Sequence, residues 1–301
     1  MPNTFARSAA APSIEPILVR DVSAPAWAVE LAAAAPRMFA LVTRKVENAA
    51  ELSPAEVERQ TFEAYASVAS ELASSGCRHP VRFWNHVPFI TDPADAGRDN
   101  YMVFNAGRFR AFSDWYGGTA RFERDVATAT AIGHWGRDLV IHCLATDAAA
   151  TAVNNPRQVA PYHYSQRFGP LPPCFARATR LAHPPQTLLV GGTASVRGED
   201  SVHIEDVPAQ LSETFTNLAS LVGAAVNDKP TTTTKQLRCL AAFGELRVYF
   251  PDPADRTEIE RAIAANFPNL RRLELLHADL CRAELMVEIE GVADLSGLRA
   301  S

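Results

Sequence analysis

The sequence has no hydrophobic run long enough to cross a bilayer and no surplus of positive charge. Its longest stretch without a charged residue, residues 181–196, is interrupted by Pro184 and Pro185, whereas a membrane-spanning helix needs about 20 apolar residues. Lys and Arg number 29 against 34 Asp and Glu, a net charge of −5, which is unlike a general nucleic-acid-binding protein. We expect neither a membrane nor a nucleic acid as a partner. No apolar segment follows Arg7, so we expect no secretory signal and a cytoplasmic location.

Recognised catalytic and metal-binding motifs are absent as well. The five cysteines are scattered without a CxxC pair, and no two of the eight histidines are four residues apart. This spacing argues against a disulfide framework and a zinc site, and it predicts free thiols. The sequence also lacks the GxGxxG, P-loop, HExxH and GxSxG patterns. We expect neither a metal nor a cofactor.

What the sequence contains is typical of a globular protein of about two domains. Hydrophobic residues make up 47% and charged residues 21% of the 301 residues. Ser53, Pro54 and Glu56 form a capping box, which predicts a helix that ends near Gly76. Residues 81–90 and 139–144 predict strands. Residues 1–50, rich in Ala and Pro, are interpreted as an N-terminal arm.

The second half of the chain alternates strand and helix patterns. Apolar positions recur at the spacing of one helix face at Leu211, Phe215, Leu218 and Val222, and another helix is predicted after residue 255. Strands are predicted at residues 187–196, 237–250, 271–280 and 284–292. This order predicts an α+β fold in which mixed β-sheets have helices packed on one face.

Residues 154–177 form a Pro-rich segment of irregular backbone, the kind of segment in which sites often lie. Arg157, Arg167 and Arg177 recur there, interleaved with Tyr162 and Tyr164. A guanidinium binds a carboxylate through two parallel hydrogen bonds, and a tyrosine hydroxyl adds a directional one. The segment therefore suits a small dianionic acid. The alternative is that these are three solvated surface arginines.

The last predicted strand has acidic residues on one face and apolar residues on the other. Glu288 and Glu290 alternate with Val287 and Ile289, and alternate residues of a strand point the same way. If Glu288 is buried, desolvation raises its pKa and makes it a usable general acid at neutral pH. The alternative is a pair of surface glutamates on a solvent-facing sheet.

Six stretches carry a family resemblance: residues 81–90, 100–108, 154–164, 168–178, 191–203 and 281–291. Taken together they resemble the chorismatases, which cleave the enolpyruvyl ether of chorismate and release pyruvate. Residues from 191 onward also resemble the small RidA (YjgF) proteins. The resemblance covers roughly residues 78–292 and implies two RidA-like lobes, which we place at residues 51–180, with the substrate loop, and 181–301.

The chorismatase resemblance also implies roles for individual residues. Glu288 would protonate the methylene carbon of the enolpyruvyl group, Arg157 and Arg177 would bind the substrate carboxylates, and Tyr162 would hydrogen-bond the substrate. Two further positions vary with the product in the family. These positions are Cys281, which we count among the catalytic residues, and Gly191, which we count among the substrate-binding residues. Together they imply that the products are pyruvate and 3-hydroxybenzoate, accompanied by 4-hydroxybenzoate, as in the subgroup linked to pigment precursors.

The sequence leaves two other functions and two oligomeric states as alternatives. A RidA-like enamine or imine hydrolase would use one arginine and backbone groups, and a non-catalytic protein would bind an aromatic acid without turnover. Internal pairing of two lobes favours a monomer, whereas RidA proteins form trimers.

Overall fold

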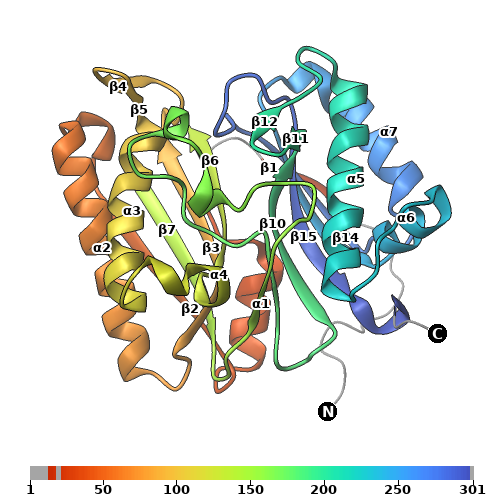
Figure 1. Cartoon of the computed structure of the whole chain (residues 1–301), viewed down its shortest axis with the longest axis horizontal. Coiled ribbons are helices and arrows are strands. Elements are labelled where there is room, and N and C mark those ends of the chain that lie inside the picture. Colours follow the sequence, from red (N-terminus) through yellow and green to blue (C-terminus); the bar gives the residue numbers. More distant parts are fainter. Residues whose placement is uncertain (1–12, 18–21, 299–301) are drawn as a thin grey trace.

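The computed structural model describes residues 13–17 and 22–298 as two β-sheets that face each other, with most helices on their outer sides (Figure 1). One sheet has four strands and the other has seven. The α+β class with mixed sheets and helices on one face of each is therefore confirmed. The helix Ala26–Ala34 is an exception, because it packs between the sheets, where Trp27 contacts Trp84 in a cluster that includes Leu189.

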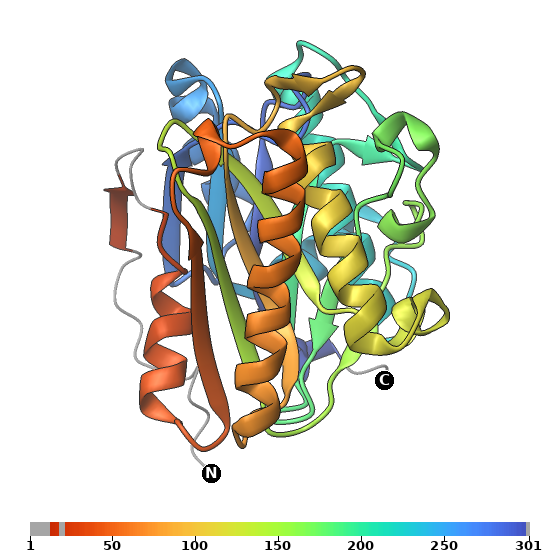
Figure 2. The same cartoon turned by 90° about the vertical axis from the view of Figure 1, so that its left-hand side faces the viewer.

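The four-stranded sheet comes from the first half of the chain and has the order β2-β7-β3-β6. Helices α2 and α3 lie side by side against its outer face (Figure 2). The strands are β2 (Phe39–Val46), β3 (His79–Pro88), β6 (Thr128–His134) and β7 (Leu139–Thr146), and the helices of this half are α1 (Ala26–Ala34), α2 (Pro54–Ser74), α3 (Asn100–Tyr116) and α4 (Phe122–Asp125). A small hairpin of β4 (Pro93–Asp95) and β5 (Arg98–Asp99) precedes α3.

Local sequence signals set the ends of these helices. The Ser53 side chain accepts a hydrogen bond from the Glu56 amide at the start of α2, as the capping box predicts. Asp99 caps α3 in the same way through the Met102 amide, and Gly117 in the left-handed conformation ends it.

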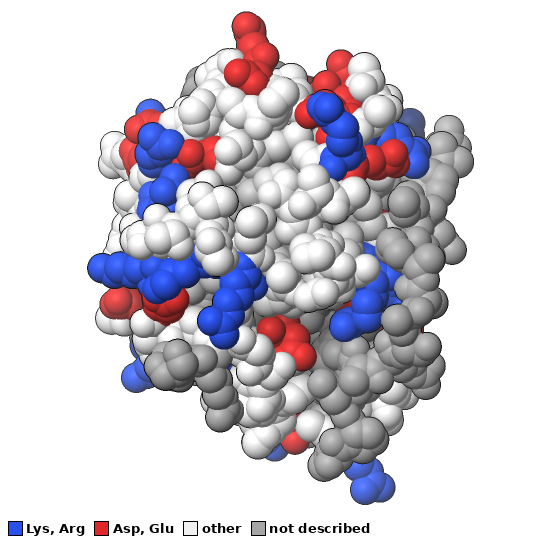
Figure 3. Space-filling view, turned by 90° about the vertical axis from the view of Figure 1, so that its right-hand side faces the viewer, with Lys and Arg blue, Asp and Glu red and all other residues white. Residues whose placement is uncertain are grey.

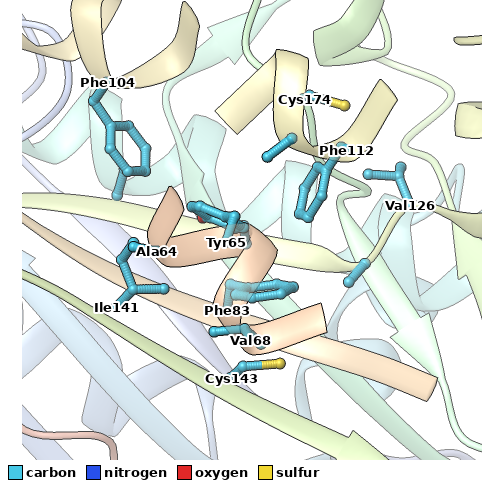
Figure 4. Close-up of a cluster of buried hydrophobic side chains, with 14 of the residues drawn as sticks. Ala64, Tyr65, Val68, Phe83, Phe104, Phe112, Val126, Ile141, Cys143 and Cys174 are labelled. Carbon is cyan, nitrogen blue, oxygen red and sulfur yellow. The ribbon is translucent and has the colours of Figure 1, made fainter. Parts of the chain in front are cut away.

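An aromatic cluster fills the space between these helices and the sheet (Figure 4). Tyr65 from α2, Phe83 from β3 and Phe112 from α3 are all fully buried, with ring centroids 5.1–5.5 Å apart. Burying side chains of this size supplies much of the driving force for folding. This cluster fixes α3, which carries part of the site described below.

The seven-stranded sheet has the order β1-β14-β13-β15-β10-β9-β8 and is covered by helices from the second half of the chain (Figure 1). Its strands are β1 (Ser13–Ile17), β8 (Thr151–Val153), β9 (Ala178–Arg180), β10 (Thr187–Ala194), β13 (Phe243–Phe250), β14 (Arg272–His277) and β15 (Glu288–Asp294), and the helices are α5 (Val207–Ala225), α6 (Thr233–Leu240) and α7 (Arg256–Asn266). A two-stranded hairpin, β11 (Val196–Arg197) and β12 (Asp200–Ser201), follows β10.

The structure differs from the sequence-based expectations in three places. Residues 237–240, predicted as strand, end helix α6, whose start is capped by Thr232. The segment interpreted as an arm supplies β2, which pairs along its whole length with β7, while residues 1–12 and 18–21 of that segment lie outside the described residues. Strands β8 and β9 belong to the segment that we placed in the first lobe, residues 51–180. Pairing of β9 with β10 and of β8 with β9 makes them part of the second sheet instead.

Charges of both signs are interspersed on the face that carries α5, α6 and α7 (Figure 3). That face therefore has no large field of one sign. Within the described residues, no helix combines the length and the apolar character needed to cross a membrane.

We expect Gly107→Ala to destabilise the fold by about 1–3 kcal/mol, the usual range for overpacking. Helices α2 and α3 approach closely at Gly107, where an added Cβ would overlap the Glu58 carbonyl oxygen and lie 2.7 Å from Thr61 Cβ. The measurement is the free energy of unfolding in urea. Gly76→Ala is the matched control, because an added Cβ there meets nothing within 4 Å. An equal effect of the two substitutions would contradict the close contact.

Candidate active site

A cavity of about 320 Å³ lies where strand β6 of one sheet meets β10 and β15 of the other. Backbone hydrogen bonds join the two parts of the molecule around it, from Ala176 to Ala127 (3.0 Å) and from Gly133 to Asp279 (2.7 Å). Side chains from α3, β6, β10, β15 and the segments 164–177 and 281–285 line it. Those used below are Tyr101, Arg108, Thr130, Tyr164, Phe168, Phe175, Arg177, Gly192, Cys281, Arg282 and Glu288.

Glu288 is a buried acid that faces this cavity without a partner. Glu288 is 5% exposed, and its carboxyl makes no hydrogen bond and no ion pair within the described part of the chain. Burial, and after it the neighbouring Glu290, raises the pKa of Glu288 to about 8. The carboxyl therefore holds its proton at neutral pH, as a general acid requires. The solvent-facing alternative for this strand is wrong.

Glu290 lies on the same face of β15 but, unlike Glu288, has hydrogen-bond donors at both carboxylate oxygens. Its Oε1 accepts a hydrogen bond from Trp84 Nε1 (2.8 Å), and its Oε2 accepts from Arg82 Nη2 (2.6 Å) and Thr130 Oγ1 (2.6 Å). Val287 and Ile289 point to the other face and pack in the core beneath α5. The predicted division of this strand into an acidic and an apolar face is confirmed.

A β-bulge in β10 makes room for the Glu288 carboxyl. The pairing of β10 with β15 shifts register between Val190 and Thr193, and an added Cβ at Gly192 would overlap Glu288 Oε1. Gly191, the glycine that the sequence singled out, is buried instead against β6, where an added Cβ would lie 2.7 Å from Thr128 Cγ2. Gly192 rather than Gly191 lines the cavity.

Three arginines line the cavity with no carboxylate as a partner among the described residues: Arg108, Arg177 and Arg282. Arg108 is fully buried and donates to Asn105 Oδ1 (2.6 Å). Arg177 donates to the Tyr164 hydroxyl, and Arg282 donates to the Glu199 carbonyl oxygen (2.8 Å).

Aromatic rings flank these guanidinium groups, and two buried guanidinium nitrogens have no hydrogen-bond acceptor among the described residues. The Arg282 guanidinium lies 4.2 Å from the Phe168 ring centroid, and those of Arg108 and Arg177 lie 5.5 and 5.3 Å from that of Phe175. Nε of both Arg108 and Arg177 is buried without a hydrogen-bond acceptor. Buried cations are normally paired, so this group of arginines is suited to an anionic ligand.

The other two residues predicted to bind substrate lie outside the cavity lining. Arg157 forms an ion pair with Glu213 on helix α5 and donates to Asn217 Oδ1 (2.8 Å). Tyr162 packs in the core against Phe122 and its hydroxyl accepts from Asn154 Nδ2 (3.1 Å). Two residues further on, Tyr164 occupies the position at the cavity.

Cys281 lies at the cavity as a neutral thiol. Burial, and after it Glu288, raises the pKa of this thiol to about 12. A thiol is a much weaker nucleophile than a thiolate, so this environment does not favour Cys281 as a nucleophile. The other four cysteines are buried, and none of the five forms a disulfide. Within the described residues, no cluster of three or more His, Cys, Asp or Glu side chains is arranged to hold a metal ion.

The sequence identified Glu288, Arg177 and Cys281, which the structure brings together, and named Tyr164 only as one of the two tyrosines of the Pro-rich segment. It missed Arg108 and Arg282 as site residues. A signal for both was present. Arg108 ends the stretch 100–108, and Arg282 lies in the stretch 281–291, both of which carry the family resemblance.

Comparison with known proteins assigns the family. A family model for the N-terminal part of FkbO/Hyg5-like chorismatases matches residues 26–145. A chorismatase of Streptomyces rapamycinicus is 32% identical over 239 residues, which cover 77% of this chain and 69% of the relative. The chain belongs to the chorismatase family. A 3-hydroxybenzoate synthase of Streptomyces hygroscopicus is 30% identical, over 77% of this chain and 68% of that protein.

A solved chorismatase crystal structure has the same arrangement. It aligns with a TM-score of 0.73 at 28% identity, over 85% of this chain and 75% of that chain. RidA from an Antarctic Psychrobacter aligns over 40% of this chain and 87% of its own length, with 16% identity and a TM-score of 0.32. The resemblance to chorismatases is confirmed, and the chain is an enzyme.

We expect Glu288→Gln to stabilise the protein increasingly as the pH rises. Between about pH 5 and pH 8 the unfolded chain ionises Glu288 while the folded protein keeps the proton, so wild-type stability falls with rising pH. Glutamine removes this loss, and the difference in free energy of unfolding should grow by at most about 1.4 kcal/mol per pH unit. Urea unfolding at several pH values measures it.

The exposed Glu63 offers a matched Glu→Gln control, because its carboxylate only pairs with Arg59 on the surface of α2. Its substitution should leave the pH dependence of stability above pH 5 unchanged. A pH-independent effect of Glu288→Gln would mean that Glu288 is ionised in the folded protein.

Proposed function

We propose that this chain cleaves the enolpyruvyl ether of chorismate to pyruvate and 3-hydroxybenzoate. The observation that carries the proposal is a buried Glu288 that faces a cavity with three arginines, none of the four having an ion-pair partner among the described residues. The pKa of Glu288 is raised to about 8, which favours the protonated form at neutral pH. Chorismate is a dicarboxylate with an acid-labile enol ether, so it needs both features. Membership of the chorismatase family supports the same reaction.

Glu288 supplies the proton that starts the reaction. In this mechanism its carboxyl transfers the proton to the methylene carbon of the enolpyruvyl group, which leaves an oxocarbenium ion at the ether carbon. The neighbouring ring hydroxyl attacks the ring carbon that carries the ether oxygen and gives its proton to the Glu288 carboxylate. The bond between that carbon and the ether oxygen breaks, and its electrons complete the carbonyl group of pyruvate. The epoxide left on the ring opens at the carbon that first carried the hydroxyl, and the proton of the other epoxide carbon moves to the oxygen as the ring becomes aromatic, which gives the 3-hydroxyl group. No atom is gained or lost overall.

The arginines recognise the two carboxylates and shape the chemistry. Arg108, Arg177 and Arg282 offer guanidinium groups without competing carboxylates, and Tyr164 adds a hydroxyl beside Arg177. Charge-assisted bonds to buried carboxylates are strong and directional. The apolar rings around them limit access of water, which would otherwise capture an oxocarbenium ion.

The aromatic product follows from the relatives rather than from the cavity alone. One relative is named 3-hydroxybenzoate synthase, which supports 3-hydroxybenzoate as the product here. The accompanying 4-hydroxybenzoate stays a prediction from the sequence, together with the roles given there to Gly191 and Cys281 as positions that set the product.

The first test is incubation of the purified protein with chorismate, without added metal, followed by chromatography. We expect pyruvate and 3-hydroxybenzoate in equal amounts, with any 4-isomer resolved in the same run. A non-aromatic diol with pyruvate would contradict the proposed product. No consumption of chorismate would overturn the function, and turnover of a 2-imino acid instead would assign a RidA-like hydrolase.

Glu288→Gln is expected to lower kcat by about 10²- to 10⁴-fold, the usual contribution of a general acid. Because the acid form is the active one, wild-type kcat/KM should decline as the pH rises through about 8. Steady-state kinetics between pH 5 and 9.5 measure both effects. A rate that increases through pH 8 would contradict Glu288 as the proton donor.

Arg177→Gln is expected to raise KM by about 10- to 100-fold, the range for losing a hydrogen bond to a charged group. Arg157→Gln is the matched comparison. The Arg157 charge is already paired with Glu213 outside the cavity, so its removal should lower stability and leave KM nearly unchanged. The opposite ranking of KM would restore the assignment of Arg157 to the substrate carboxylates.

A further inference from the structure

The strand that carries the proton donor also carries a second acid of very different surroundings. Glu290 is two residues from Glu288 on the same face, and its residue is 2% exposed. Three donors satisfy its two oxygens, one of them a guanidinium. Glu290 is therefore held in a closed ion pair with Arg82 inside the molecule.

Thr130 connects Glu290 to the backbone that borders Glu288. The Thr130 hydroxyl donates to Glu290 Oε2 (2.6 Å) and accepts from the Gly192 amide (2.9 Å). Gly192 lies in the β10 bulge against the Glu288 carboxyl. An unbroken series of contacts thus runs from Glu290 through Thr130 and Gly192 to Glu288.

Charged and titratable groups surround the two acids. Strand β3 contributes Arg82 and, on the same face, His86; β6 contributes His134 on the face of Thr130, and β10 has no charged or titratable side chain. The groups from the remaining elements are Arg247 and Tyr249 of β13, Tyr101 and Arg108 of α3, and Arg177, Cys281, Arg282 and Glu284 of the cavity segments. The arginines favour ionisation of Glu288, and burial and Glu290 oppose it.

We propose that Glu290 is a positioning residue that keeps Glu288 protonated and directed into the cavity. Its charge opposes a second charge on the same face of the strand, and its bond to Thr130 holds the Gly192 bulge that leaves room for the carboxyl. Two acids on one strand thereby have separate roles, one ionised and structural, the other neutral and reactive. The catalytic consequence rests on the proposed function, whereas the effect on the Glu288 proton does not.

Burial explains part of the raised pKa of Glu288, and Glu290 is the next cause. Arg82 acts in the opposite direction but is a smaller cause. Replacing Glu290 by glutamine removes the opposing charge and leaves Arg82 unpaired. Both changes favour ionisation of Glu288.

The test compares Glu290→Gln with Glu274→Gln. Glu274 forms an equally buried ion pair with Arg247, with side chains 6% and 3% exposed, but it is not among the causes of the Glu288 shift. Infrared difference spectra, from which the spectrum of the corresponding Glu288→Gln protein is subtracted, follow the carboxyl band of protonated Glu288 as the pH is raised. We expect the midpoint to fall by at least one pH unit in Glu290→Gln and to stay unchanged in Glu274→Gln.

Kinetics on chorismate give the second measurement. In Glu290→Gln the decline of kcat/KM should move to lower pH by the same amount, with a loss of about fivefold or more at pH 8 that shrinks below pH 6. A merely structural role would lower activity equally at every pH and leave the midpoint in place, which would overturn the proposal. If wild-type protein leaves chorismate untouched while the infrared midpoint still shifts, the proposed function fails and the role of Glu290 stands.

A double variant covers the case in which Glu290→Gln does not fold. Arg82→Gln/Glu290→Gln removes both members of the pair, so that neither charge stays buried alone. Because Glu290 influences Glu288 more than Arg82 does, the infrared midpoint should still fall, by less than in the single variant. A midpoint unchanged in the double variant would overturn the proposal.

Discussion

The ion pair between Arg82 and Glu290 crosses the space between the two sheets, and the arrangement of the site depends on it. Both side chains are at most 3% exposed, so each charge is stabilised by the other and by the hydrogen bonds of Trp84 and Thr130. Removing one member of such a pair destabilises the fold by far more than the intact pair stabilises it, because the remaining charge stays buried. The pair therefore joins β3 and β6 to β15 in one register, which places Thr130 beside the strand that carries Glu288.

Local patterns in the sequence predicted those parts of the fold that depend on neighbouring residues. The Ser53 cap, the apolar face of α5 and the alternation around Glu288 are set within one helix or strand, and all appear as expected. Helix α6 was missed because its apolar residues also fit a strand. The family resemblance supplied the role of Glu288, which no spacing argument alone assigns.

The remaining site residues depend on contacts between distant segments. Arg108 and Arg282 are 174 positions apart in the chain numbering, and both reach the cavity because α3 packs on one sheet and the segment 281–285 precedes a strand of the other. Arg157 and Arg177 look alike in the sequence, yet Glu213 on α5 neutralises the first and no carboxylate among the described residues pairs with the second. Pairing of this kind is decided by tertiary structure.

The cavity is an internal interface, since its walls come from both sheets and neither sheet encloses it alone. Glu288, the proposed proton donor, comes from the second half of the chain, while Thr130 and Arg108 come from the first. Separate halves would thus each carry an incomplete set of groups. Covalent linkage of the halves keeps their local concentration high. A complete pocket forms only when the two sheets have docked in register.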